Sequence, residues 1–127
     1  MNFQYTPRPR YEEYWDWTAV ALFLLLTLDL LTSMYAAGVS GLEHEANPFM
    51  AWLLAQSLGV IIAVHILAVV LLVAFFHALF EVIDDIPAKY RGPTAFSIEI
   101  FLGLLIAAGL FVFANNVSFI ILGESLL

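Results

Sequence analysis

The sequence has no cysteine, few basic residues and few charged residues of either sign, and each of these limits what the protein can be. Without cysteine, neither a disulfide framework nor a thiolate metal site can form. Four basic residues stand against eleven acidic ones, which gives a net charge of -7. Because nucleic-acid binders need a basic surface and anionic headgroups attract basic residues, we expect neither nucleic acid nor anionic lipid to be the recognised partner.

Only 12% of the 127 residues are charged, whereas soluble domains usually carry about 25%. With 63% hydrophobic residues and a mean hydropathy of +0.95, residues 1–127 are expected to form one integral membrane domain in the lipid bilayer. Prolines and acids precede the first apolar run, unlike a cleaved signal, so residues 1–16 are interpreted as a cytoplasmic or interfacial segment. The acid-rich composition also suggests a high-salt organism, a hypothesis that a stability optimum at low salt would contradict.

The apolar runs predict an all-α membrane protein with three transmembrane helices. The first run, residues 17–39, covers roughly 34 Å, enough for a hydrocarbon core of about 30 Å. The second stretch is too long for one straight crossing, so we divide it at Ser57 into a short interfacial or re-entrant helix at about 48–57 and a span at about 59–82. One tilted helix projecting into water is the alternative. The third span is expected at about 95–117, and the pattern leaves open whether the remaining residues continue it.

Basic residues occur in two places only, the N-terminal segment and the loop between spans two and three. They are Arg8, Arg10, Lys89 and Arg91. Because basic residues mark the cytoplasmic side, we expect a multi-pass plasma-membrane protein with a cytoplasmic N-terminus. The loop that contains Glu45 and the C-terminus are then extracytoplasmic.

Asp29 is placed near the middle of the first span. An ionised carboxylate there costs about 2.5–3.5 kcal/mol on insertion scales, so it should face protein or water. At helical spacing it shares a stripe with small and hydroxylated residues, namely Thr32, Ser33, Ala36, Ala37 and Ser40. Two interpretations stay open: a packing seam with a protonated or hydrogen-bonded Asp29, and a proton or cation site.

Thr32, Glu45 and His65 are candidates for the same site, because their expected positions converge in the outer half of the bundle. Glu45 also has a local explanation, since a carboxylate is favoured at the positive end of the helix that follows it. His65 has one too, because a single histidine on an apolar helix is more often a satisfied core residue than a ligand. With Asp29 these residues would form a carboxylate–histidine site for a proton or cation, and the sequence specifies no metal.

Asn47 and Pro48 predict a helix start with a built-in cap, because Asn is a preferred N-cap and Pro is favoured at the first helical position. The preceding His44-Glu45 pair is not the zinc signature H-E-x-x-H, because Pro48 occupies the position of the second histidine. The sequence also has no G-x-S-x-G elbow, P-loop or dinucleotide glycine pattern. We assign no catalytic residue and no cofactor.

A second polar group is expected towards the cytoplasmic end. His77 and Glu81 are four residues apart and can pair on one helix face, and Glu99 has a similar depth. Snorkelling and structural pairing explain all three, and the alternative is the inner end of a polar pathway towards Asp29. Asn115 and Asn116, near the outer end of the third span, are interpreted as capping or interfacial residues.

The stretch "LDLLTSMYAAGVSGLEHEANPFM" resembles a family of small, uncharacterised prokaryotic integral membrane proteins. The family pattern is an intramembrane Asp, a Thr shortly after it, a Gly-containing turn, and Glu-x-Asn-Pro at the next helix start. The matching positions are Asp29, Thr32, Glu45, Asn47 and Pro48. The resemblance covers about the first half of the chain. It implies a shared site built from Asp29, Glu45 and Asn47, and it implies no activity or substrate.

We therefore expect a small transporter, channel-like or oligomeric membrane protein with a proton- or cation-responsive polar site. The alternative is a structural or accessory subunit without activity of its own. A membrane enzyme with Glu45 or His65 as acid or base ranks last. Because three spans leave little room for a pore, transport predicts a homo-oligomer or a partner membrane subunit. Gly103-xxx-Ala107, a small-xxx-small pattern, suggests close packing against a neighbour.

Overall fold

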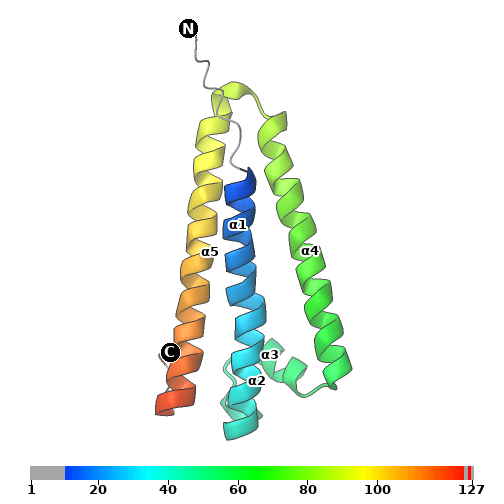
Figure 1. The fold of residues 1–127 in the computed structure, drawn as a ribbon, viewed down its shortest axis with the longest axis vertical. Coiled ribbons are helices and arrows are strands. Elements are labelled where there is room, and N and C mark those ends of the chain that lie inside the picture. Colours follow the sequence, from blue (N-terminus) through cyan, green and yellow to red (C-terminus); the bar gives the residue numbers. More distant parts are fainter. Residues whose placement is uncertain (1–10, 125, 127) are drawn as a thin grey trace.

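The structure, a computed structural model, describes residues 11–124 and 126, and those residues contain helices and no strand. Three helices in this part are long and apolar enough to cross a membrane, Glu12–Ser40, Leu58–Asp85 and Ala88–Leu122. The predicted all-α architecture with three spans is confirmed (Figure 1). Residues 1–10, which carry two of the basic residues used for orientation, lie outside the described residues.

The first span is one continuous helix with a wide segment in its middle. It comprises α1 (Tyr11–Leu22), a π-helical segment η1 (Phe23–Leu28) and α2 (Asp29–Ser40). The Asp29 amide donates to the carbonyl of Leu24, five residues back, as in a π-helix. This widened turn is frequent at functional sites, and here it ends directly before the intramembrane carboxylate.

The predicted break in the second apolar stretch is confirmed, and the single tilted helix is wrong. The chain forms a short helix α3 (Pro48–Leu54) and a separate span α4 (Leu58–Asp85). Asn47 Oδ1 accepts hydrogen bonds from the Phe49 and Met50 amides at 3.0 and 3.4 Å. Ser57 Oγ accepts from the Val60 amide at 3.4 Å, so each helix begins with a side-chain cap.

The third helix is longer at both ends than the predicted segment 95–117. Helix α5 (Ala88–Leu122) begins before Pro93 and continues through the asparagines to a left-handed Gly123 (φ 72°). Pro93 lies close to the start of the helix, where the missing hydrogen bond of its ring nitrogen falls on an exposed, polar end. The prediction was short because it was set by bilayer thickness, which does not limit a helix that continues into water.

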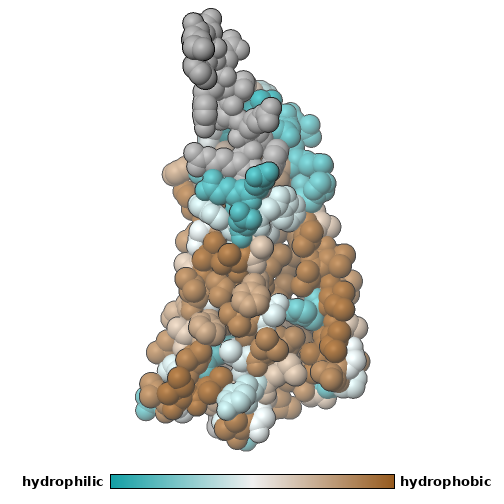
Figure 2. Space-filling model, viewed as in Figure 1, coloured by the Kyte–Doolittle hydropathy of each residue, from teal (hydrophilic) through white to brown (hydrophobic). Residues whose placement is uncertain are grey.

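The α1–α2 helix and α5 run parallel, and α4 returns antiparallel and diverges from them along its length (Figure 1). We call the end with the Ile86-Pro87 turn the Pro87 end, and the end with residues 41–47 and α3 the Glu45 end. A core cluster lies at each end. The first contains Tyr14, Phe76, Phe80, Ile83, Ile98 and Leu102, and the second contains Leu30, Met50, Leu53 and Ile61. Figure 2 shows a hydrophilic cap at the Pro87 end above a broad hydrophobic surface.

Helix α5 approaches the first span closely at the π segment. Gly109 is buried, and a Cβ added there would lie 2.7 Å from Leu24 Cβ. The glycine of the small-xxx-small pattern, Gly103, has nothing within 4 Å of the same position. Close packing of α5 against the π segment therefore depends on Gly109 and not on Gly103.

Candidate functional site: a polar cavity at the Glu45 end

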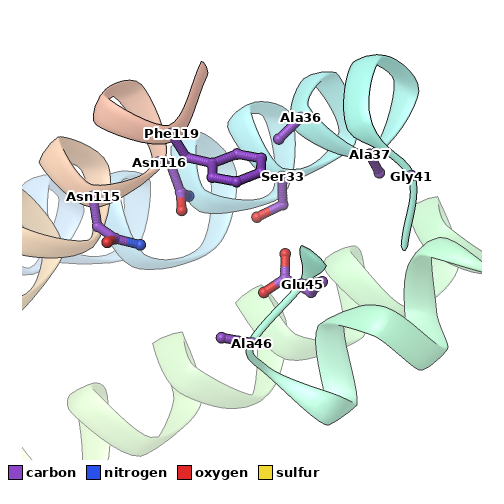
Figure 3. Close-up of a pocket in the computed structure, with 9 residues that line it drawn as sticks. All are labelled: Ser33, Ala36, Ala37, Gly41, Glu45, Ala46, Asn115, Asn116 and Phe119. Atoms are coloured by element: carbon purple, nitrogen blue, oxygen red, sulfur yellow. The ribbon is translucent and has the colours of Figure 1, made fainter. Parts of the chain in front are cut away.

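A cavity of about 60 Å³ lies between α2, the loop of residues 41–47 and the end of α5 (Figure 3). Its lining combines small side chains with four polar residues and one ring: Ser33, Ala36, Ala37, Gly41, Glu45, Ala46, Asn115, Asn116 and Phe119. Gly41 has φ 88°, a conformation that glycine adopts without steric cost, and this turn brings the loop back over α2. The small residues leave room for the cavity, and the polar residues line it with hydrogen-bonding groups and one carboxylate.

Asp29 lies directly behind this cavity, in a hydrogen-bonded group that joins α2 to α5. Its Oδ1 accepts from Asn116 Nδ2 at 2.9 Å and from Ser33 Oγ at 3.4 Å. Asn116 Nδ2 also donates to Thr32 Oγ1 at 2.8 Å. The predicted stripe on α2 therefore faces protein, with Ser33 buried and Asp29 half-buried.

The orientation of the Asn116 amide follows from its partners. Thr32 donates its own hydroxyl proton to the Leu28 carbonyl at 2.7 Å, so towards Asn116 it offers a lone pair. Asp29 Oδ1 already accepts, so only the amide NH₂ group can satisfy both neighbours. Both amide protons are thereby used, and the amide oxygen is left as an acceptor beside the cavity.

Sequence reasoning missed Asn116 as the partner of Asp29, because the register between the first span and α5 is known only from the structure. Tyr14 donates to Glu99 at 2.9 Å across a separation of 85 residues, and Asp29 meets Asn116 across 87. In two parallel helices, residues at the same depth differ by a nearly constant residue number, because both helices rise by about 1.5 Å per residue. A pairing of Tyr14 with Glu99 would therefore have placed Asn116 at the depth of Asp29.

Glu45 lines the cavity and also has the local role that its position suggests. Its Oε1 accepts from the Asn47 amide at 3.1 Å, immediately before α3. Figure 3 shows the Glu45 carboxylate and the Ser33 hydroxyl facing each other across the cavity. The structure thus brings Glu45 to Ser33 and Asn116, the two residues that also hydrogen-bond Asp29.

His65 is placed elsewhere. Its Nε2 lies 3.3 Å from Thr27 Oγ1, in a contact that links α4 to the π segment. His65 is not among the residues that line the cavity. The two titratable groups that an acid–base mechanism would need, Glu45 and His65, therefore do not share this cavity.

The polar residues towards the Pro87 end are divided between two contacts. His77 Nε2 lies 3.1 Å from Glu81 Oε1, with side chains 64% and 66% exposed. Glu99 accepts from the Tyr14 hydroxyl, and the hydrogen bonds of the described residues do not connect it with the His77–Glu81 pair. The pairing at i, i+4 is thus present, and a continuous path from it to Asp29 stays a prediction.

Among the described residues no group of three or more His, Cys, Asp and Glu side chains could hold a metal ion. The chemistry available at the cavity is therefore that of one lining carboxylate, a second carboxylate behind it, and neutral oxygens.

The sequence matches no protein-family model, and comparison with curated proteins and with solved structures gives no match to this chain. The resemblance to the small prokaryotic membrane proteins therefore stays a prediction.

Proposed function

We propose that this three-span membrane protein is a transporter or channel-like protein with a proton- or cation-responsive site at Asp29 and the adjoining cavity. One observation carries the proposal: Ser33 and Asn116 both bind Asp29 and both line a cavity with Glu45. Asp29 lies eleven residues from the end of α2 at Ser40, a distance of about 16 Å along the helix axis. Intramembrane carboxylates are costly and commonly mark ion pathways and proton relays.

Asp29→Asn is expected to reduce proton or cation flux through proteoliposomes to the rate of protein-free liposomes. The asparagine oxygen can still accept from Asn116, so the contact between α2 and α5 is kept while the carboxylate is removed. The measurement is the initial rate of tracer uptake or of internal pH change under an imposed gradient. Glu43→Gln, on the same loop but outside the cavity lining, is the control and should transport as the unmodified protein does.

An accessory subunit without transport is the second candidate, favoured by the bridge that Asn116 makes between α2 and α5. In this function the polar group only holds helices together. Flux would then be absent from both the unmodified protein and Asp29→Asn, which separates the two functions in the same experiment. The prediction of several copies per functional unit stays a prediction.

We further propose that the Glu45 end faces the outside of the plasma membrane. The Pro87 end carries Lys89 and Arg91, whereas residues 41–57 contain no basic residue. A C-terminal alkaline phosphatase fusion is therefore expected to be active, and a C-terminal green fluorescent protein fusion dark. The reverse pair of signals would overturn this orientation.

A further inference from the structure

We infer that the cavity binds a monovalent cation of about the size of Na⁺, held by the Glu45 carboxylate, Ser33 Oγ and Asn116 Oδ1. This inference rests on the proposed function, because it names the ion class of the same site. Its starting point is the arrangement of three side-chain oxygens from α2, the loop and α5 around one small space (Figure 3).

Asp29 sets the direction of two of these oxygens. Ser33 donates its proton towards Asp29 Oδ1, which leaves the hydroxyl lone pairs for the cavity. Asn116 donates both amide protons, to Asp29 and Thr32, and its Oδ1 remains as an acceptor. Ser33 and Asn116 therefore each present an acceptor to the cavity, and a cation satisfies acceptors that cannot hydrogen-bond to one another. Asn115 also lines the cavity, and its Oδ1 accepts from the Leu126 amide. Asp29 is a positioning residue in this site.

Charge favours a monovalent ion over a divalent one. Glu45 is the one carboxylate in the lining, and its Oε1 is already engaged by the Asn47 amide. Calcium takes six to eight oxygen ligands, including several carboxylates, and magnesium demands a near-ideal octahedron. Zinc prefers His and Cys ligands, and the described residues provide no group of three or more metal-ligating side chains. One direct carboxylate with neutral oxygens matches a single positive charge.

The volume of the cavity is the next guide to which cation it holds. A cavity volume of about 60 Å³ is enough for a small cation together with water, because one water needs roughly 10–15 Å³ by this measure. A quaternary ammonium ion such as choline cannot replace Na⁺ as a partner of these oxygens, because methyl groups surround its charge. Choline therefore serves as the ionic-strength substitute in a binding experiment.

The test is equilibrium binding of radiolabelled Na⁺ to the purified full-length protein in detergent, at constant ionic strength with choline chloride. Saturable binding is expected, with an affinity at least tenfold weaker in Glu45→Gln. The glutamine oxygen can still accept from the Asn47 amide, so the loop geometry is retained. Glu43→Gln is the matched control and should bind as the unmodified protein does. Circular dichroism and melting temperature establish that each variant is folded.

Absence of saturable Na⁺ binding in the folded protein would overturn the inference. So would binding that Glu45→Gln leaves unchanged, or displacement of Na⁺ by equimolar Ca²⁺. If Na⁺ binds in the expected way while proteoliposomes show no flux, the cation site stands and the transport function fails. If flux depends on Asp29 while Na⁺ does not bind, the transport function stands and the monovalent-cation assignment fails.

Discussion

Asn116→Leu is expected to destabilise the protein by about 1–3 kcal/mol, because it leaves the Asp29 carboxyl and the Thr32 hydroxyl without their shared donor. The cost arises from an intramembrane polar group that loses its partner, and no water from the lipid side can replace it. The measurement is the free energy of unfolding in mixed micelles, followed by circular dichroism.

A double-mutant cycle separates this contact from general effects of the substitution. When Asp29→Leu is combined with Asn116→Leu, both polar partners are gone, and the loss should be smaller than the sum of the two single losses. Interhelical hydrogen bonds in membranes average about 0.6 kcal/mol in such cycles, with a maximum near 1.7 kcal/mol. A coupling energy of at least about 0.6 kcal/mol is expected. Strict additivity would show that Asp29 and Asn116 do not interact.

Gly109→Ala is expected to destabilise the protein by about 1–3 kcal/mol, the usual cost of overpacking a tight contact. Its new methyl group would lie 2.7 Å from Leu24 Cβ, an atom fixed to the backbone of the π segment, so α5 must move away. This cost outweighs the gain of about 0.5–1 kcal/mol that alanine normally brings to a helix interior. Unfolding of both proteins in the same mixed micelles measures the difference.

Gly103→Ala is the matched control on the same helix, and it should not destabilise the protein. Nothing lies within 4 Å of a Cβ at this position, so only the helix-propensity gain should remain, and stability should be unchanged or slightly higher. If both substitutions had the same effect, the close approach of α5 to the π segment would be contradicted.

Much of the fold could be predicted because hydrocarbon imposes strong rules on sequence. Length and hydropathy identified three spans, and the break at Ser57 was favoured because the second apolar stretch is too long for one straight crossing. The cap at Asn47 followed from local hydrogen-bond chemistry. These are properties of single segments, and each can be judged without knowledge of its neighbours.

The candidate site could be predicted only in part because it depends on the register between helices. Asp29 was identified because a carboxylate is unusual within a membrane, and Glu45 because it precedes a helix start on the outer loop. The structure places Glu45 at the cavity that adjoins Asp29. Asn116 looked like an interfacial residue until its depth relative to Asp29 was fixed by the packing of α5. The π segment changes the helical phase before Asp29, and the sequence "FLLLTL" carries no signal for it.

The central claim is that the polar group around Asp29 serves an ion or a proton and is more than a seam between helices. It is tested most directly by measuring flux and stability on the same preparation of Asp29→Asn. We predict that flux falls to the protein-free rate while the free energy of unfolding changes by less than about 1 kcal/mol, because the hydrogen bond to Asn116 is retained. Flux equal to that of the unmodified protein in a folded Asp29→Asn variant would contradict the claim.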